Sequence, residues 1–269
     1  MKVVLFCGGL GLRLRGLAEN VPKPLVSIGY RPVLWHVMKY YAHYGHTDFI
    51  LCLGYKADAI KQFFLEYDEC ISNDFVLSGG ETRIELLHRD IENWRITFCD
   101  TGLTASIGQR LRAVRKHLEG EEFFLANYSD GLSDLPLDRF SQRFLASGKT
   151  GAFALVRPTH AFHVVSTRDD DLVSSITDLG SSGIRINGGF FMFRRDIFDY
   201  IRPGEELVHE PFQRLIDAEQ LVAYEHPGFW TCMDTFKDQQ RLEDLFASGE
   251  APWELWREPG SERGGRGSS

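Results

Sequence analysis

An apolar run that leads directly into a glycine-rich loop constrains the fold of this chain most strongly. Residues 2–7 read KVVLFC, a continuous apolar segment that is typical of a strand covered on both faces. The loop at residues 7–14 reads CGGLGLRL, and residues 32–45 then place apolar side chains at helical spacing. A second apolar strand is predicted over residues 48–53. A strand, a helix and a strand in this order indicate a βαβ unit and therefore a parallel sheet.

The rest of the chain continues the alternation of helices and strands. Further helices are expected over residues 57–67, 106–118, 136–146, 211–218 and 236–247. Further strands are expected over residues 122–127, 151–157, 163–167, 172–176 and 188–193. Residues 72–100 read instead as an inserted region of three short antiparallel strands. We therefore predict one α/β domain over residues 1–258, with a mixed, mainly parallel sheet flanked by helices and a strand-rich second half. A disordered tail is expected over residues 259–269.

The composition limits the partners of the protein. The 30 Lys and Arg against 38 Asp and Glu give a net charge of −8, so no bulk positive field exists to attract nucleic acid or anionic lipid. No apolar run of about 18 residues could span a membrane, and no signal peptide is recognisable, so we expect a soluble, cytoplasmic protein. The cysteines are odd in number, contain no C-x-x-C pair and are expected to be reduced, without a zinc site; they are Cys7, Cys52, Cys70, Cys99 and Cys232.

The glycine-rich loop fits neither of the two best-known phosphate-binding motifs. A dinucleotide fingerprint would require glycine at the position of Leu14, and a Walker A loop before Lys149 would require glycine at the position of Arg143. The loop nevertheless follows a strand of a predicted parallel sheet, and ligands bind at the carboxyl ends of such strands. Its backbone N–H groups can approach a phosphate or a base closely.

A lysine held between two prolines lies shortly after this loop. Pro22 and Pro24 restrict the backbone on both sides of Lys23, so its ammonium group would be held near the loop. Together with Arg13 in the loop, it offers two cations that suit a triphosphate. Lys23 taken alone would more simply be an exposed turn residue, but the neighbouring glycine-rich loop favours a ligand.

Two aspartates each follow a strand-like segment. Asp130 ends the segment FFLANYSDG, and Asp234 ends PGFWTCMDT before a predicted helix. Either could be a helix cap or a turn residue. If the fold brings them together, their oxygens suit a magnesium ion whose other positions are filled by substrate phosphates.

Several longer motifs extend these observations. They are GGLGLRL (8–14), PKPLVSIG (22–29), PVLWHVMKYYAHYG (32–45), DTG (100–102), GQRLRAV (108–114), YSDG (128–131), INGGFF (186–191), HPGFWTCMDTFKD (226–238) and APW (251–253). Over residues 1–253 the chain resembles the sugar-1-phosphate nucleotidyltransferases, most closely the glucose-1-phosphate cytidylyltransferase branch. The resemblance implies a Rossmann-like, glycosyltransferase-A-like fold and a strand-rich half that binds the sugar. It also implies assembly as a homo-oligomer.

The resemblance implies transfer of a cytidylyl group from CTP to a sugar 1-phosphate, with release of pyrophosphate. The nucleotide would contact Leu5, Cys7, Gly8, Gly9, Gly11, Arg13, Lys23, Arg110, Ser129 and Asp130. Arg13 and Lys23 would be the catalytic cations. The acceptor would contact Tyr128, Arg185, Asn187 and Gly188. Asp130 and Asp234 would hold Mg²⁺. Because the attacking phosphate oxygen is already anionic, positioning and charge neutralisation suffice without a strong general base.

The chain departs from the family pattern at three places. Leu12 replaces a threonine, and Ser129 replaces a glycine. The Glu-Lys-Pro segment expected before INGGFF is missing, so no lysine lies between Thr177 and Gly183. Arg185 is the nearest cation and is predicted to contact the acceptor phosphate, with a surface ion pair as the alternative.

These departures leave two other functions open. The enzyme could act on a different phosphorylated acceptor, or the chain could be a non-catalytic, regulatory protein that binds a nucleotide sugar. The joint presence of Lys23, Asp130 and Asp234 argues against the second of these.

Overall fold

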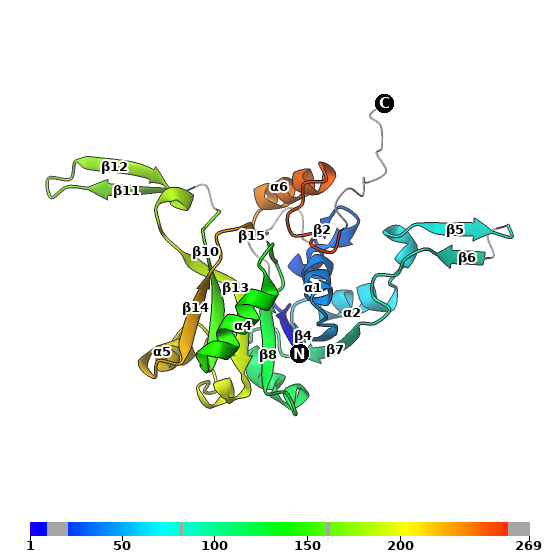
Figure 1. Ribbon diagram of the computed structural model, residues 1–269, viewed down its shortest axis with the longest axis horizontal. Coiled ribbons are helices and arrows are strands. Elements are labelled where there is room, and N and C mark those ends of the chain that lie inside the picture. The colour runs from blue at the N-terminus through cyan, green and yellow to red at the C-terminus, as the bar shows by residue number, and fades with distance from the viewer. Residues whose placement is uncertain (10–20, 81–82, 160–161, 258–269) are drawn as a thin grey trace.

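A seven-stranded sheet forms the centre of the molecule (Figure 1). The computed structural model describes residues 1–9, 21–80, 83–159 and 162–257. In spatial order the strands are β14 (Leu221–Glu225), β10 (Gly151–Val156), β13 (Ile186–Arg194), β8 (Phe123–Tyr128), β1 (Val3–Phe6), β4 (Asp48–Leu53) and β7 (Arg95–Asp100). Strand β13 runs antiparallel to both of its neighbours, and the other pairs are parallel. The prediction of a mixed, mainly parallel sheet flanked by helices is confirmed.

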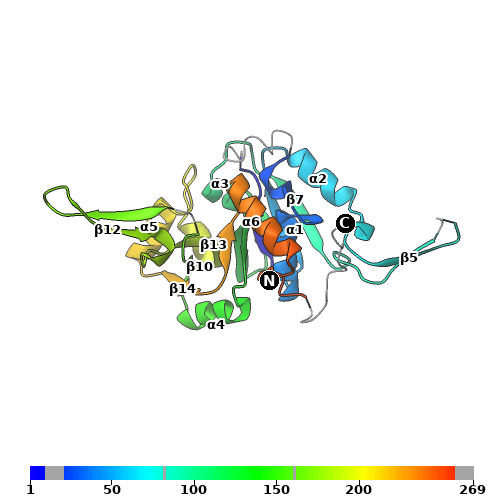
Figure 2. The same cartoon turned by 90° about the horizontal axis from the view of Figure 1, so that it is seen from above.

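Helices cover both faces of this sheet (Figure 2). The side chains of β1 alternate between two cores, Val3 and Leu5 in one and Val4 and Phe6 in the other. The first core is covered by α1 (Val33–His43), α2 (Ala57–Leu65), α4 (Leu137–Ser147) and α6 (Phe236–Ala247). The second is covered by α3 (Ile107–Ala113) and α5 (Glu210–Asp217). Burial on both faces explains why this strand is apolar at every position.

Two hairpins project from opposite ends of the body (Figures 1 and 2). One consists of β5 (Phe75–Ser78) and β6 (Arg83–Leu86), and the other of β11 (His163–Thr167) and β12 (Val173–Asp178). The expectation of three antiparallel strands over residues 72–100 is wrong for the third, β7. This strand pairs in parallel with β4, because Ile96 and Phe98 pack against the core instead of against the hairpin.

Short elements complete the fold. Two small ribbons pair β2 (Ser27–Ile28) with β3 (Arg31–Pro32), and β9 (Gly131–Ser133) with β15 (Trp230–Cys232). The 3₁₀ turns are η2 (Lys23–Leu25), η3 (Glu69–Ile71), η4 (Arg115–Leu118), η5 (Leu179–Ser181) and η6 (Arg195–Asp199). The helix expected over residues 106–118 is thus divided into α3 and η4. The expected tail at residues 259–269 lies outside the described residues. None of the described helices combines the length and hydrophobicity needed to cross a membrane.

Candidate active site

Lys23, Asp130 and Asp234 meet at one point beyond the carboxyl end of the central strands. Lys23 Nζ lies 2.6 Å from Oδ2 of Asp130 and also contacts Oδ1 of Asp234. The two aspartates come together because β9 pairs with β15, which places Gly131 opposite Cys232. The fold therefore assembles three side chains that the sequence analysis selected separately.

Local backbone structure holds Lys23 in place. It begins η2, where the amide of Leu25 donates to the carbonyl of Pro22 at 2.8 Å. Its side chain is only 16% exposed. Burial by itself would lower the pKa of Lys23, but the charge of Asp130 and the hydrogen bonds to both carboxylates outweigh it, so the pKa is raised. The ammonium group is therefore charged at neutral pH.

Asp234 is positioned by the start of α6. Thr235 caps this helix, and the carboxylate of Asp238 accepts hydrogen bonds from the backbone amides of Asp234 at 3.1 Å and Thr235 at 2.8 Å. Cys232 Sγ lies 3.6 Å from Oδ2 of Asp234. Burial and the charges of Asp234 and Asp130 raise the pKa of Cys232 to about 12, so this thiol remains protonated and can donate to the carboxylate.

The end of β1 provides backbone next to this cluster. Leu5 and Cys7 are buried in the core, so their side chains do not face solvent. Burial raises the pKa of Cys7 to about 12, which keeps that thiol neutral. Ser129 Oγ donates to the carbonyl of Phe6 at 2.9 Å and thereby joins the ends of β8 and β1. Gly9 is exposed, whereas Gly11 and Arg13 lie outside the described residues.

Arg110 lies beneath the glycine backbone and is 3% exposed. Its guanidinium donates to the carbonyl of Gly8 at 2.9 Å and to Thr101 Oγ1 at 2.7 Å. It also donates to the carbonyls of Leu53, Gly102 and Leu103. A Cβ atom on Gly8 would lie 2.0 Å from Nη1 of Arg110, so the two residues are in tight contact. The side chain thus connects the segments at the carboxyl ends of β1, β4 and β7. The contact between Arg110 and a nucleotide stays a prediction.

The residues predicted to bind the acceptor lie at the start of β13 and the end of β8. Asn187 Oδ1 accepts a hydrogen bond from the amide of Gly189 at 2.8 Å, and the carbonyl of Gly188 accepts one from Trp230 Nε1 at 2.8 Å. Gly189 has a φ of +75°, and a Cβ atom there would lie 2.4 Å from the ring of Tyr128. Gly189 therefore allows the backbone to pass directly over this tyrosine, whereas a Cβ atom on Gly188 would meet Val156 and Trp230.

Arg185 forms an ion pair at the same edge of the sheet. Its Nε donates to Oε1 of Glu225 on β14 at 3.0 Å. This is the surface ion pair that the sequence analysis kept as the alternative. Val156 lies opposite Ile186, so Arg157 and Arg185 directly adjoin the ends of two paired strands. The backbones of these two arginines are therefore neighbours at this edge of the sheet.

The buried His226, for which the sequence predicts no role, supports the site. Nε2 of His226 lies 2.8 Å from Oδ1 of Asp134 and 3.2 Å from the carbonyl of Phe229. The pair connects the segment after β9 with the segment before β15, the two strands that align Asp130 and Asp234. Its only signal in the sequence was its place in the HPGFW motif.

The donor set at the cluster suits a hard divalent cation. Asp130 and Asp234 supply carboxylate oxygens, which are the protein ligands that magnesium prefers. Within the part of the chain that the structure describes, no group of three His, Cys, Asp or Glu side chains is arranged to bind a metal. Two protein carboxylates are the usual number where substrate phosphates complete the coordination.

Comparisons with known proteins place the chain among relatives of known family and fold. Residues 2–238 match the model of the Nucleotidyl transferase family. The glucose-1-phosphate cytidylyltransferase of Salmonella typhimurium is 38% identical over 257 residues, which cover 95% of this chain and 100% of that protein. The protein of the same name from Salmonella typhi is 37% identical with the same coverage. A solved UDP-glucose pyrophosphorylase in complex with UDP-glucose has a TM-score of 0.66 at 11% identity, covering 92% of this chain and 98% of that one, which shows likeness of fold.

Proposed function

The chain belongs to the nucleotidyl transferase family, and we propose that it transfers a cytidylyl group from CTP to glucose 1-phosphate. The observation that carries this proposal is the contact of Lys23 with both Asp130 and Asp234 beside the end of β1. The near-complete coverage of two glucose-1-phosphate cytidylyltransferases supports the choice of substrates. A different acceptor and a non-catalytic role are both less favoured, because the chain keeps this charged cluster and aligns with those enzymes along its length.

In the proposed reaction a phosphate oxygen of the sugar phosphate attacks the α-phosphorus of CTP. The new P–O bond forms as the bond from the α-phosphorus to the bridging oxygen breaks, and pyrophosphate leaves with that electron pair. Lys23, which stays protonated because its pKa is raised, would neutralise charge on the α-phosphate. No proton has to be removed from the nucleophile, so positioning dominates the chemistry.

Asp130 and Asp234 would hold Mg²⁺. The two carboxylates exceed the single positive charge of Lys23, so the cluster retains negative charge that attracts a divalent cation. The ion would supply charge neutralisation and orientation at the phosphates when it is bound. The capping contacts of Asp238 hold the backbone of Asp234 in position for this role.

The acceptor phosphate would be held by arginines that replace the missing family lysine. Arg185 and Arg157 adjoin the paired ends of β13 and β10, at the edge of the sheet where β10 has its carboxyl end. The ion pair with Glu225 keeps Arg185 at this edge but also competes for its guanidinium. An arriving dianionic phosphate would compete with a single carboxylate for the arginine.

We also expect the protein to form a homo-oligomer through its two hairpins. Each hairpin exposes apolar side chains: Val76, Leu77 and Ile84 on one, and Val165, Val173 and Ile176 on the other. An isolated two-stranded hairpin is marginally stable in water, so a second copy that covers these side chains would stabilise it. Sedimentation velocity on the full chain measures the assembly, and a monomer at micromolar concentration would exclude it.

A pyrophosphate-release assay tests the proposed activity. Each of the four nucleoside triphosphates is combined with glucose 1-phosphate, mannose 1-phosphate, galactose 1-phosphate and glucose 6-phosphate. We expect release that requires both CTP and glucose 1-phosphate. Release with CTP and another acceptor would keep the reaction and change the substrate. No release with any pair would exclude the proposal.

A further inference from the structure

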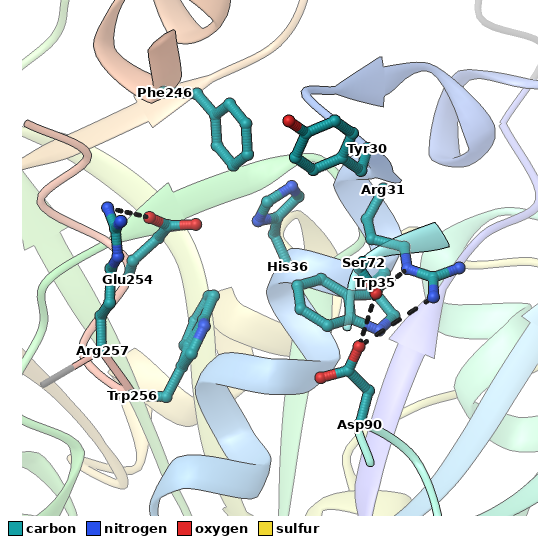
Figure 3. A pocket seen from close by; sticks show the side chains of 10 residues that line it. All are labelled: Tyr30, Arg31, Trp35, His36, Ser72, Asp90, Phe246, Glu254, Trp256 and Arg257. Atoms are coloured by element: carbon teal, nitrogen blue, oxygen red, sulfur yellow. Dashed lines mark hydrogen bonds and ion pairs between the residues drawn. The ribbon is translucent and has the colours of Figure 1, made fainter. Parts of the chain in front are cut away.

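A second pocket lies apart from the catalytic cluster, and none of Lys23, Asp130 and Asp234 lines it. It has a volume of about 210 Å³ and is formed by the β2–β3 ribbon, the start of α1, the end of α6, the base of the β5–β6 hairpin and the segment after Trp253 (Figure 3). Five of its lining residues carry aromatic rings: Tyr30, Trp35, His36, Phe246 and Trp256. The proposed function uses none of them.

Aromatic rings form the walls of this pocket on several sides (Figure 3). The rings of Trp35 and Trp256 meet edge to face with centroids 5.9 Å apart, and Tyr30 and Phe246 do so at 6.0 Å. The ring of His36 lies between these two pairs, 6.0 Å from Phe246 and 6.3 Å from Trp256. Tyr30 is nevertheless 57% exposed, so one wall is open to an entering ligand.

The ring nitrogens of His36 are used inside the protein. Nε2 donates to the carbonyl of Ile28 at 3.0 Å, since a carbonyl can only accept. Nδ1 then accepts from Trp253 Nε1 at 3.3 Å. His36 thus offers a neutral ring surface to the pocket and no acid or base.

The charged groups of the pocket are paired with one another. Arg31 donates to Ser72 Oγ at 2.9 Å, and Asp90 accepts from Ser72 at 2.7 Å and from Lys39 at 3.0 Å. At the other end Arg257 lies 3.7 Å from Glu254, within ion-pair distance. Arg31, Lys39 and Arg257 each lie within 4.0 Å of a carboxylate, so a phosphate would have to compete with that carboxylate for each cation.

We infer that this pocket is a second ligand site that binds a nucleobase. A flat, uncharged ring can stack on the aromatic walls, and a base edge presents adjacent donors and acceptors that match Glu254 and Arg257. A sugar ring fits less well, because its many hydroxyl groups would need partners while the polar atoms around Asp90 already bind one another. This inference goes beyond the proposed function and does not depend on it.

The pocket is connected to the catalytic cluster by two elements that run side by side. Lys23 lies at one end of the segment 23–32 and Tyr30 near its other end; Asp234 precedes α6 and Phe246 lies near the end of that helix. Hydrogen bonds join the two elements along their length. Gln239 Nε2 donates to the carbonyl of Ser27 at 3.2 Å, and the amide of Gly29 donates to Glu243 at 3.0 Å.

Packing makes the link between these two elements tight. A Cβ atom on Gly29, which has a φ of +61°, would lie 1.9 Å from the ring of Phe246. A base inserted next to Tyr30 and Phe246 would therefore shift the segment 23–32 against α6. The shift would reach the contact between Lys23 and Asp234, and occupancy of the pocket would change the affinity of the active site.

Binding of phosphate-free nucleosides tests the site directly. Cytidine, uridine, adenosine and guanosine are each titrated into the full-length protein, with calorimetry and tryptophan fluorescence as readouts, because Trp35 and Trp256 line the pocket. We expect at least one nucleoside to bind, and saturating CTP should not displace it. Tyr30→Ala should weaken this binding about tenfold through lost stacking. Phe162→Ala, which removes an exposed aromatic ring next to the β11–β12 hairpin at the opposite end of the molecule, is the matched control and should leave it unchanged.

The coupling is tested by measuring the dissociation constant of CTP with and without the nucleoside. We expect a change of at least about fivefold in the wild-type protein, the lower end of typical coupling between two sites, and none in Tyr30→Ala. Displacement of the nucleoside by CTP, or unchanged binding in Tyr30→Ala, would overturn the inference. Binding of methyl glucoside in place of any nucleoside would overturn the ligand class. The nucleoside titrations need neither CTP binding nor pyrophosphate release, and the coupling needs CTP to bind but not to react, so the two proposals fail separately.

Discussion

The ammonium nitrogen of Lys23 lies 2.6 Å from Oδ2 of Asp130, and the same nitrogen contacts Asp234, 211 residues further along the chain. One cation thus holds together two carboxylates that follow different strands. Without it, the two negative charges would repel each other in a partly buried site. The contact therefore serves both the stability of the site and the proposed chemistry.

Replacing Lys23 by methionine tests its proposed role in catalysis. The variant Lys23→Met should lower kcat and kcat/KM together by about 2–4 kcal/mol of transition-state stabilisation, because the charge on the α-phosphate is no longer neutralised. Steady-state kinetics of pyrophosphate release measure both constants. Lys61→Met, on the exposed side of α2, is the control. A variant altered only in its KM for CTP would show that Lys23 binds substrate without favouring the transition state.

The raised pKa of Lys23 predicts how the stability of the protein depends on pH. A cationic group whose folded pKa exceeds its unfolded value of 10.5 contributes stability that is fully present below pH 10.5 and is lost as the pH rises through the folded pKa. The difference in free energy of unfolding between wild type and Lys23→Met should therefore stay constant from pH 7 to 10 and shrink above that range. Urea denaturation across this range measures it. A difference that already falls between pH 7 and 9 would contradict the raised pKa.

The carboxylates are tested together with metal removal. The variants Asp130→Asn and Asp234→Asn should each lower kcat, with a rise in the activation free energy on the order of several kcal/mol. The reason is that an amide attracts the proposed magnesium ion far less than a carboxylate does. EDTA should abolish activity in the wild-type protein, and added Mg²⁺ should restore it. Asp170→Asn, in the exposed turn of the β11–β12 hairpin, is the control and should change neither kcat nor the response to EDTA and Mg²⁺. Normal turnover in EDTA would exclude the metal.

Substitutions at two neighbouring glycines test whether the packing of Arg110 against Gly8 stabilises the fold. Gly8→Ala would place a Cβ atom 2.0 Å from Nη1 of Arg110, whereas the Cβ atom of Gly9→Ala would meet none of the described residues within 4 Å. We expect Gly8→Ala to lower the free energy of unfolding by about 1–3 kcal/mol, the usual cost of overpacking, with Gly9→Ala close to wild type. Arg110→Lys should resemble Gly8→Ala, because an ammonium with three donors cannot replace a five-donor guanidinium that contacts five acceptors. Thermal denaturation compares the three variants, and an unchanged Arg110→Lys would show that the buried contacts contribute little.

The ion pair between Arg185 and Glu225 gives opposite expectations for its two members. Arg185→Ala should raise the KM for the sugar phosphate much more than the KM for CTP, because the phosphate loses a cation. Glu225→Gln should lower the KM for the sugar phosphate, since the arginine no longer pairs with a carboxylate. Substrate titrations of both variants measure these constants. Unchanged acceptor kinetics in Arg185→Ala would show that the ion pair is purely structural and would direct attention to Arg157.

The local sequence predicted the strands that are buried on both faces and the helices whose first and last residues carry a recognisable signal. The run KVVLFC indicated β1 because both of its faces are buried, and helices α4 and α6 appeared within one residue of their predicted bounds. The strand-like segment before Asp234 contains β15, but β9 and β14 were missed, because β9 has only three residues, β14 is only partly buried, and both pair with residues far away in the chain. The parallel pairing of β7 was also missed, since its residues have the same alternating pattern as the neighbouring hairpin strands.

The residues of the candidate site could be selected from the sequence, but their assembly could not be predicted from it. Glycines after a strand, a lysine between prolines and aspartates after strands are local signals of phosphate and metal chemistry, and they selected Lys23, Asp130 and Asp234. Only the tertiary structure decided that these three meet, that Arg110 donates to the backbone beneath Gly8, and that Arg185 pairs with Glu225. The physical reason is that a residue's type limits what it can bind, whereas its partner is set by long-range strand pairing and packing, which no local pattern encodes.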